Sequence, residues 1–231
     1  QECLRDKYWK DLVSTKSLGK GQVGQVYRVN TTEEAMALKI LRIRDIDSLV
    51  RGGLAPTVQG FATEVASQEV AAEIGLAVPV LDYFVCGAHD AIIPSLAFLL
   101  MPLIDGEDMG RYLSHATSGD LQCQKQYIGG APSVDGWMTT TMYNKLVKAA
   151  DWLDQAGVWV SDFHPGNVMV DDTGKLVFID FGFSGKCKLK KGHAVAHALG
   201  RLGCPLPRGL VEIGVPSCEN AEESEEEPEE K

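Results

Sequence analysis

The sequence predicts an α+β protein with two lobes that share a cleft. Three observations predict it: β-type runs fill Val13 to Leu41, and helical spacings of apolar residues cover Thr57 to Ile74 and Met138 to Gln155. We therefore expect a β-rich N-terminal lobe at residues 1–101 and a shortened, mainly helical C-terminal lobe at 102–218. A chain of 231 residues with 45% hydrophobic content can bury one sizeable core or two small ones.

The N-terminal lobe begins with the runs VYRV and MALKIL. Glycine-rich and TTEE turn sequences separate these runs. Such a pattern predicts an antiparallel meander. A helix follows, and Gly75 together with Pro79 ends it. Two further strands are expected at Val78 to Val85 and at Ala97 to Met101. The apolar positions that define the helix are Val58, Phe61, Val65, Val70 and Ile74.

The C-terminal lobe begins near Ser114 to Trp137, a stretch rich in Gly, Ser, Asp and Gln that predicts a loop or an insertion. The helix after it closes at Gly157. Two short strands are expected at Val168 to Val170 and Leu176 to Ile179, joined by the turn DDTG. The apolar positions of the helix are Met142, Leu146, Ala149, Ala150 and Leu153.

The negative charge of the chain is concentrated at its C-terminal end. The formal net charge is −10, and the segment Glu219 to Lys231, with eight Glu and one Lys, carries −7 of it. We expect residues 219–231 to form a disordered acidic tail, because the segment has almost nothing to bury. The rest of the chain is nearly neutral, which argues against nucleic-acid binding through a broad basic surface. Only Lys186 to Lys191 (KCKLKK) offers a basic cluster.

The cysteines predict the compartment. The chain has six, scattered and without CxxC spacing, at Cys3, Cys86, Cys123, Cys187, Cys204 and Cys218. This pattern favours free thiols in a reducing, intracellular compartment, and it leaves delivery into a host cell as an effector open.

No membrane span is expected. The longest apolar run, Ala91 to Ile104, is short for a span and is interrupted by Pro94 and Pro102, so it predicts a buried strand. The chain begins at Gln1 rather than Met, which leaves open whether this terminus is native or processed.

The first motif with chemical meaning is GxGxxGxV, formed by Gly19, Gly21, Gly24 and Val26. Glycines at this spacing let backbone amides approach phosphate oxygens, although a flexible hairpin turn has the same pattern. A dinucleotide-binding motif would be followed by a helix, whereas VYRV continues as a strand. The strand favours a lid over nucleotide phosphates.

The second motif is Lys39 inside the apolar strand MALKIL. A buried lysine is costly unless it has an anionic partner, which nucleotide phosphates and a helix carboxylate would supply. A lysine on an edge strand that reaches solvent is the simpler alternative. The carboxylates available on the following helix are Glu64 and Glu69.

The third motif joins SDFHPGN, containing Asp162 and Asn167, to the DFG sequence that starts at Asp180. Phosphoryl transfer needs a carboxylate that orients the acceptor hydroxyl or accepts its proton, and oxygen ligands that hold Mg²⁺ against the phosphates. Asp162 is the candidate for the first role, and Asn167 with Asp180 for the second. The order and spacing of all three motifs make a chance match improbable.

These motifs resemble the protein-kinase-like superfamily over roughly Leu18 to Gly182. The form DFHPGN is most similar to an atypical, minimal branch that contains RIO, ABC1 and aminoglycoside-phosphotransferase-like kinases. The resemblance implies ATP and Mg²⁺ as cofactors, a catalytic role for Asp162 and Lys39, and Glu64 as the partner of Lys39, with Glu69 still open. It implies nucleotide contacts by the residues Gly19, Gly21, Gly24, Val26, Ala37, Lys39, Glu64, Met101 and Leu103.

The chain also departs from typical eukaryotic protein kinases. Those carry HRD and a lysine two residues after the catalytic aspartate, whereas here Val160 and Ser161 replace His and Arg, and His164 stands at the lysine position. No APE motif follows the DFG sequence, which predicts a reduced peptide-docking region. His193 and His197 could face one way on a helix, but two histidines without a third ligand rarely form a zinc site.

Three functions are compatible with this pattern. The leading hypothesis is a small, atypical Ser/Thr protein kinase with a protein substrate. The alternatives are a small-molecule kinase that acts on an alcohol, as aminoglycoside or choline kinases do, and a nucleotide-binding pseudokinase. The polar residues Lys39, Asp162, Asn167 and Asp180 are all present, which counts against the pseudokinase. Neither the substrate nor the oligomeric state follows from the sequence.

Overall fold

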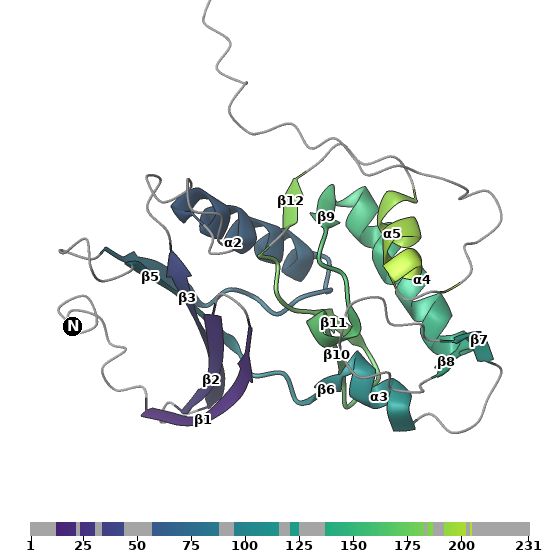
Figure 1. Cartoon of the computed structure of the whole chain (residues 1–231), viewed down its shortest axis with the longest axis horizontal. Coiled ribbons are helices and arrows are strands. Elements are labelled where there is room, and N and C mark those ends of the chain that lie inside the picture. Colours follow the sequence, from purple (N-terminus) through teal and green to yellow (C-terminus); the bar gives the residue numbers. More distant parts are fainter. Residues whose placement is uncertain are drawn as a thin grey trace, which may run out of the picture.

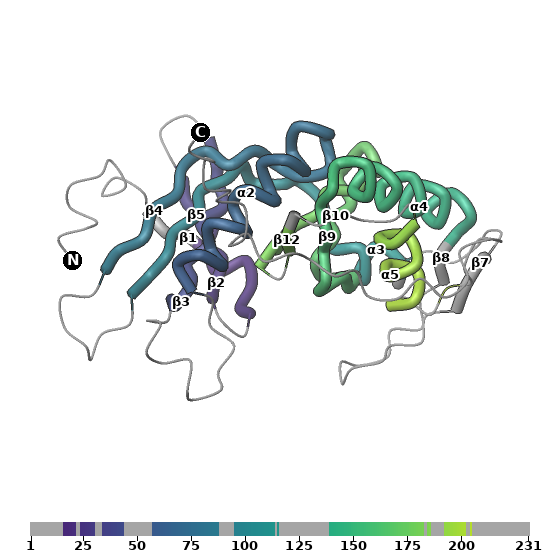
Figure 2. The backbone as a smooth tube through the Cα atoms, turned by 90° about the horizontal axis from the view of Figure 1, so that it is seen from above, coloured from purple at the N-terminus to yellow at the C-terminus, as the bar shows by residue number. Residues whose placement is uncertain are grey.

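The chain folds into two lobes, as predicted: a β-rich N-terminal lobe and a C-terminal lobe that contains most of the described helices (Figures 1 and 2). Figure 2 shows the purple and blue N-terminal elements at one end of the molecule and the green and yellow C-terminal elements at the other. The computed structural model describes residues 13–21, 24–30, 34–43, 57–87, 95–115, 121–124, 137–182, 184–186, 192–201 and 204.

The N-terminal lobe contains a five-stranded sheet with the strand order β1-β2-β3-β5-β4. All neighbouring strands are antiparallel, and the first three are connected in sequence, so the predicted meander is confirmed. The remaining two strands also form where the sequence predicts them, with shifted ends. The bounds are β1 (Val13–Lys20), β2 (Gly24–Asn30), β3 (Ala35–Ile43), β4 (Asp82–Cys86) and β5 (Ser95–Pro102).

Helix α2 (Val58–Glu73) is the predicted helix of this lobe. Its N-cap is Thr57, whose hydroxyl accepts a hydrogen bond from the Gly60 N–H at 3.0 Å. The helix ends at Glu73 with Ile74 as its C-cap, and Gly75 follows with a φ of 75°, a conformation that glycine adopts without steric cost. Phe61 and Val65 pack into the apolar cluster between the helix and the sheet. The buried face of α2 therefore points at β3 and β5.

The C-terminal lobe consists of short strands and three helices among the described residues. Its largest helix, α4, covers most of the predicted helix and is capped by Thr139, whose hydroxyl accepts from the Met142 N–H. Strands β10 and β11 form the predicted hairpin, whereas β6, β9, β12 and α3 are not predicted. The bounds are β6 (Gly106–Asp108), α3 (Met109–His115), β7 (Leu121–Gln124), β8 (Trp137–Thr139), α4 (Thr140–Gln155), β9 (Val158–Val160), the 3₁₀ helix η3 (Pro165–Asn167), β10 (Val168–Asp171), β11 (Leu176–Phe178), β12 (Ser184–Lys186) and α5 (His193–Arg201).

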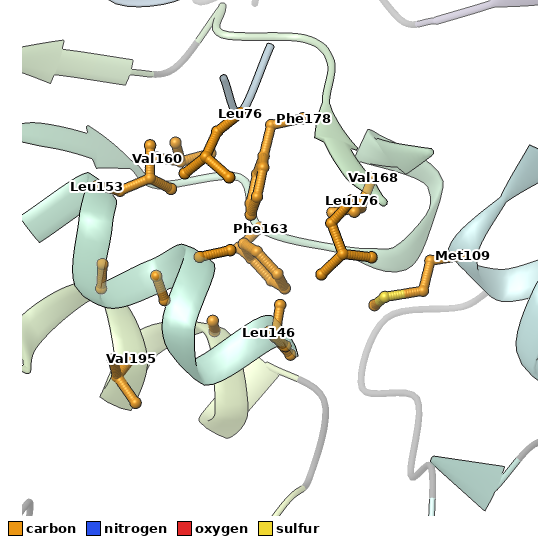
Figure 3. Close-up of a cluster of buried hydrophobic side chains, with 14 of the residues drawn as sticks. Leu76, Met109, Leu146, Leu153, Val160, Phe163, Val168, Leu176, Phe178 and Val195 are labelled. Atoms are coloured by element: carbon orange, nitrogen blue, oxygen red, sulfur yellow. The ribbon is translucent and has the colours of Figure 1, made fainter. Parts of the chain in front are cut away.

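The core of the C-terminal lobe forms around two phenylalanines, Phe163 and Phe178, whose rings lie 5.7 Å apart (Figure 3). Phe163 belongs to the SDFHPGN motif, and Phe181 of the DFG sequence is also buried. Leu76, which follows α2, joins the same core, and its carbonyl accepts a hydrogen bond from the Phe178 N–H at 2.7 Å. Each motif aspartate is thus adjacent to a side chain that the core holds in place.

Three predicted features lie mostly or wholly outside the described residues. The stretch predicted as a loop or insertion overlaps the end of α3, contains β7 and ends where the paired strand β8 begins. Its remainder, the acidic tail and most of the KCKLKK segment are outside the described part of the chain. The expected tail and the proposed lobe boundaries therefore stay predictions.

The cysteine prediction is wrong where the structure describes the side chains. Cys86 and Cys204 are both disulfide-bonded. Spacing along the chain could not reveal these bonds, because the positions of cysteines in the sequence do not show which side chains meet. The expectation of a reducing compartment therefore has no support from these residues. Within the described residues, no helix is long and apolar enough to cross a membrane.

Helix α5 is attached to α4 through one carboxylate. Asp154, near the end of α4, accepts hydrogen bonds from the backbone N–H groups of Gly192 and Ala194, each at 2.8 Å. These donors lie at the start of α5 and have no carbonyl partner within the helix. Asp154 therefore caps α5 and fixes its position against the C-terminal core.

Asp154→Ala should lower the free energy of unfolding by about 1 kcal/mol, because two N-terminal donors of α5 lose their acceptor. Urea unfolding measures the change. The matched control is Asp151→Ala on the same helix, where the carboxylate accepts only an exposed bond from Gln155. Equal effects of the two substitutions would contradict the capping role of Asp154.

Candidate active site

The centre of the site is Lys39, on the middle strand of the N-terminal sheet. Its Nζ lies 2.5 Å from Glu64 Oε1 on α2 and 2.8 Å from Asp180 Oδ1 in the DFG sequence. Lys39 and Glu64 are buried, while the Asp180 side chain is 47% exposed. The family resemblance favoured Glu64 and left Glu69 as an alternative. The geometry pairs Lys39 with Glu64, while Glu69 is exposed. The three charges bring together elements of both lobes.

These charges shift one another's pKa. Burial lowers the pKa of Lys39, but Glu64 and Asp180 outweigh that effect and hold it above 10.5. Burial raises the pKa of Glu64, and Lys39 opposes the rise. Partial burial raises the pKa of Asp180, but the charge and hydrogen bond of Lys39 outweigh burial and hold this pKa below 3.8. Lys39 is therefore a permanent cation and Asp180 a permanent carboxylate at neutral pH.

Asp180 has an unusual backbone conformation, with a φ of 64°. A positive φ is uncommon for a residue other than glycine and persists where surrounding contacts impose it. Here the carboxylate accepts from Lys39 and from the Gly182 N–H, the latter at 3.3 Å. A Cβ at Gly182 would come within 3.2 Å of Asp180 Oδ1 and 3.4 Å of Glu64 Oε2. Glycine at position 182 thus allows the DFG turn to lie against the charged group.

The second carboxylate, Asp162, lies in the loop between β9 and η3. Asn167, buried at the end of η3, donates from Nδ2 to the Asp162 carbonyl at 3.0 Å. The Asn167 carbonyl accepts from the Ile179 N–H at 2.9 Å, which joins this loop to the residue before Asp180. The Nδ2 of Asn167 is used to hold the loop, so its Oδ1 is the atom that can accept or ligate. These bonds bring Asp162, Asn167 and Asp180 into one region.

The motif glycines differ in their surroundings. A Cβ at Gly24 would lie 2.5 Å from the Ile40 carbonyl and 2.6 Å from Leu41 Cδ2, so β2 can pack on β3 only with glycine there. Gly19 has open space, and Gly21 donates its N–H to the Gly24 carbonyl at 2.9 Å. Gly24 therefore has a packing role that the sequence pattern did not distinguish, while the other two leave the backbone accessible.

Four apolar residues for which nucleotide contacts were predicted lie in one cluster. Ala37 and Met101 are buried there, and Val26 and Leu103 pack against them at partial exposure. Val26 is the cross-strand partner of Lys39. The cluster consequently provides an apolar wall next to the strand that carries Lys39.

Comparison with known proteins identifies the arrangement. The family model described as protein kinase domain matches residues 12–200. This chain belongs to the protein kinase domain family. It is 27% identical over 192 residues to CBL-interacting protein kinase 25 of Oryza sativa subsp. japonica. The aligned region covers 82% of this chain and 32% of that protein. It is 22% identical over 183 residues to the serine/threonine-protein kinase ppk31 of Schizosaccharomyces pombe, covering 78% and 15%. The chain thus spans less than a third of the length of either relative.

Two residues that the sequence analysis did not assign to the site contact residues 161–164 between β9 and η3, the segment that corresponds to the catalytic loop of this kinase domain. His197 Nε2 donates to the Ser161 carbonyl at 2.7 Å. Arg201 Nη2 lies 3.5 Å from Asp162 Oδ1, and its Nε donates to the Phe163 carbonyl at 3.4 Å. The only signal in the sequence is their four-residue spacing, which places both on one side of α5.

His193 and His197, the two histidines four residues apart, both lie on α5. Among the described residues, no group of three or more His, Cys, Asp or Glu side chains could hold a metal ion. The two histidines instead lie against the ring of Trp159, at centroid distances of 6.5 and 4.6 Å. Both rings thus pack α5 on β9, and His197 also donates to the Ser161 carbonyl.

We expect the Lys39–Glu64 pair to be energetically coupled. Lys39→Met or Glu64→Leu should each lower the free energy of unfolding by about 3 kcal/mol, because each leaves a buried charge with less compensation. The double variant should recover about 2 kcal/mol relative to the sum of the two losses. Urea unfolding of the four proteins closes the cycle, and additive losses would show that the two groups do not interact in solution.

We also expect His197 to make stability depend on pH. Burial lowers its pKa below 6.5, Arg201 acts in the same direction, and the Ser161 carbonyl and Asp162 oppose the shift. Below pH 6.5 the unfolded chain takes up a proton that the folded chain still resists. Stability from this group is therefore present above pH 6.5 and lost as the pH falls through the folded pKa.

His197→Gln tests this dependence, because glutamine keeps a donor for the Ser161 carbonyl and does not titrate. When the pH is lowered from about 7.5 to about 5.5, the midpoint temperature of thermal unfolding should decrease more in the wild type than in the variant. The same fall in both proteins would assign the pH dependence to other groups.

Proposed function

We propose that this kinase domain transfers the γ-phosphoryl group of ATP, with Mg²⁺, to a hydroxyl of a protein substrate, as a Ser/Thr kinase. The observation that carries the proposal is the position of Lys39, which is paired with Glu64 and Asp180 in the region that also contains Asp162 and Asn167. The buried Lys39 ammonium is stable because two carboxylates contact it. One of them, Asp180, is the carboxylate assigned to the metal, so Lys39 and the metal ligand lie side by side.

The donor set fits the proposed cofactors. Asp180 offers a half-exposed carboxylate, and Asn167 offers an amide oxygen. Mg²⁺ prefers hard oxygen ligands and binds through one or two carboxylates, waters and substrate phosphates, so a larger cluster of acids is not required. When bound, the metal would neutralise phosphate charge. Lys39 would contact the phosphates, and the apolar wall of Ala37 and Met101 would take the nucleotide base.

Asp162 is assigned the role next to the acceptor. Its carboxylate is half exposed, and its backbone is fixed by Asn167 and by the buried ring of Phe163. A carboxylate on a rigid loop can hold a hydroxyl in line with the phosphoryl group and accept its proton. The ion pairs of the Asp162 side chain are with His164 and Arg201, whereas Lys39 pairs with Glu64 and Asp180. We therefore assign orientation of the acceptor and binding of the nucleotide to different residues.

A protein acceptor is favoured over a small molecule by the relatives, both of which are named as protein kinases. The finer placement beside RIO, ABC1 and aminoglycoside-phosphotransferase-like kinases rests on the form DFHPGN and on Val160 and Ser161 in place of His and Arg. The test is incubation with γ-labelled ATP and Mg²⁺, once with protein extract and once with small alcohols. Label in protein bands supports the proposal, label in small molecules favours the alternative acceptor, and nucleotide binding without turnover indicates a pseudokinase.

We expect Asp162→Asn and Asp180→Asn to separate the two roles. Asp162→Asn should reduce turnover by about 100-fold or more while the affinity for Mg-ATP stays within about twofold, because the residue touches the acceptor. Asp180→Asn should reduce both, because it is assigned to the metal. Isothermal titration calorimetry gives the affinities and labelled transfer gives the turnover.

The matched control is Asp172→Asn, an exposed carboxylate in the turn between β10 and β11. It should behave as the wild type. Equal losses of Mg-ATP affinity in the Asp162 and Asp180 variants would contradict the division of roles.

A further inference from the structure

Arg201 is an unexplained basic residue at the catalytic carboxylate. It comes from α5, at the end of the described helix, and not from the catalytic loop itself. Within the described part of the chain, two basic side chains lie within 4 Å of the Asp162 carboxylate: Arg201 at 3.5 Å from Oδ1 and His164 at 3.9 Å from Oδ2. The other cation of the site, Lys39, is already paired with Glu64 and Asp180.

Helix α5 holds Arg201 in a fixed place. Its start is capped by Asp154, its middle is bonded to the Ser161 carbonyl through His197, and Arg201 itself reaches the Phe163 carbonyl. Three consecutive residues of the catalytic loop, 161–163, thus contact this one helix. A side chain on a helix attached at both ends is positioned more precisely than one on a loop.

The contacts of Arg201 do not saturate its guanidinium. The separation of 3.5 Å from Asp162 exceeds that of a direct charge-assisted hydrogen bond, and 47% of the Arg201 side chain is exposed. A half-exposed pair of this kind contributes little to stability. Structural need is therefore a weak explanation for Arg201. A guanidinium offers a planar set of donors that matches the oxygens of a phosphoryl group.

We propose that Arg201 is a further catalytic residue, whose guanidinium binds the phosphoryl group while it passes to the hydroxyl held by Asp162. The inference rests on the proposed function. In that step a bond forms between the acceptor oxygen and the γ-phosphorus, and the bond from that phosphorus to the β,γ-bridging oxygen breaks. The hydroxyl proton moves to Asp162, and the electron pair of the broken bond stays on ADP.

The physical reason is the charge near Asp162. The transferring group carries negative charge on its peripheral oxygens and passes beside an anionic carboxylate. A cation that contacts the same carboxylate reduces this repulsion and favours the transition state more than bound ATP. His164 is less suited to this role, because its Nδ1 accepts from the Gly166 N–H and its Nε2 stays 3.9 Å from Asp162.

Two substitutions distinguish a charge role from a role in holding the loop. Arg201→Lys keeps the charge and loses the planar contact to the Phe163 carbonyl, whereas Arg201→Gln keeps an amide donor and loses the charge. The matched control is Arg42→Gln, an exposed arginine on β3 in the other lobe. All four proteins are compared in labelled transfer to protein extract, and in affinity for Mg-ADP with and without aluminium fluoride, which stands in for the transferring phosphoryl group.

Arg201→Gln should reduce turnover by about 10- to 100-fold and weaken the aluminium fluoride complex by about tenfold, with the affinity for Mg-ADP alone unchanged. Arg201→Lys should lie closer to the wild type, and Arg42→Gln should match it. Unchanged aluminium fluoride affinity in Arg201→Gln, or equal damage in the lysine and glutamine variants, would overturn the inference. Absence of transfer by the wild type would overturn the proposed function instead, and the aluminium fluoride affinities would still decide the role of Arg201.

Discussion

The structure depends on one buried ammonium group held between two carboxylates. Lys39 lies on the sheet of the N-terminal lobe, Glu64 is 25 residues away on α2, and Asp180 is 141 residues away beyond the hairpin of the C-terminal lobe. Removing a lysine from water is unfavourable unless anions meet it at hydrogen-bond distance. That condition is satisfied only when α2 packs on the sheet and the DFG turn lies against both, so the electrostatic requirement fixes the relative placement of three distant segments.

The core supports this arrangement by anchoring each charged loop with a neighbouring apolar side chain. Phe163 is buried next to Asp162, Phe181 is buried next to Asp180, and Leu76 carries the end of α2 into the same core. Since packed side chains have few alternative positions, the loops that carry the carboxylates are held in place by their apolar neighbours. The positive φ of Asp180 is the local consequence of being held on both sides.

Helix α5 gives the C-terminal lobe a second constraint. It is bonded to α4 by Asp154 and to the catalytic loop by His197 and Arg201, so the loop is held from the core on one side and from α5 on the other. Typical kinases carry His and Arg immediately before the catalytic aspartate, and this chain has Val160 and Ser161 there. In this chain, contacts from the separate helix α5 hold the loop that carries Asp162.

The sequence by itself determined the fold class, the meander, the helices α2 and α4 and the polar residues of the site, because period, turn chemistry and motif spacing are local properties of a chain. The residues alone did not separate Glu64 from Glu69, since both lie on the same helix, and Glu64 was favoured only by the family resemblance. The packing of α2 decides which one is buried. The sequence could not assign Arg201, because a pair that is separated by almost forty residues leaves no local pattern. The expectation of free thiols was wrong for Cys86 and Cys204, because the spacing of cysteines along a chain does not show which of them pair. Contacts between distant segments were decided by the tertiary structure alone, since they exist only after burial and charge pairing have placed those segments together.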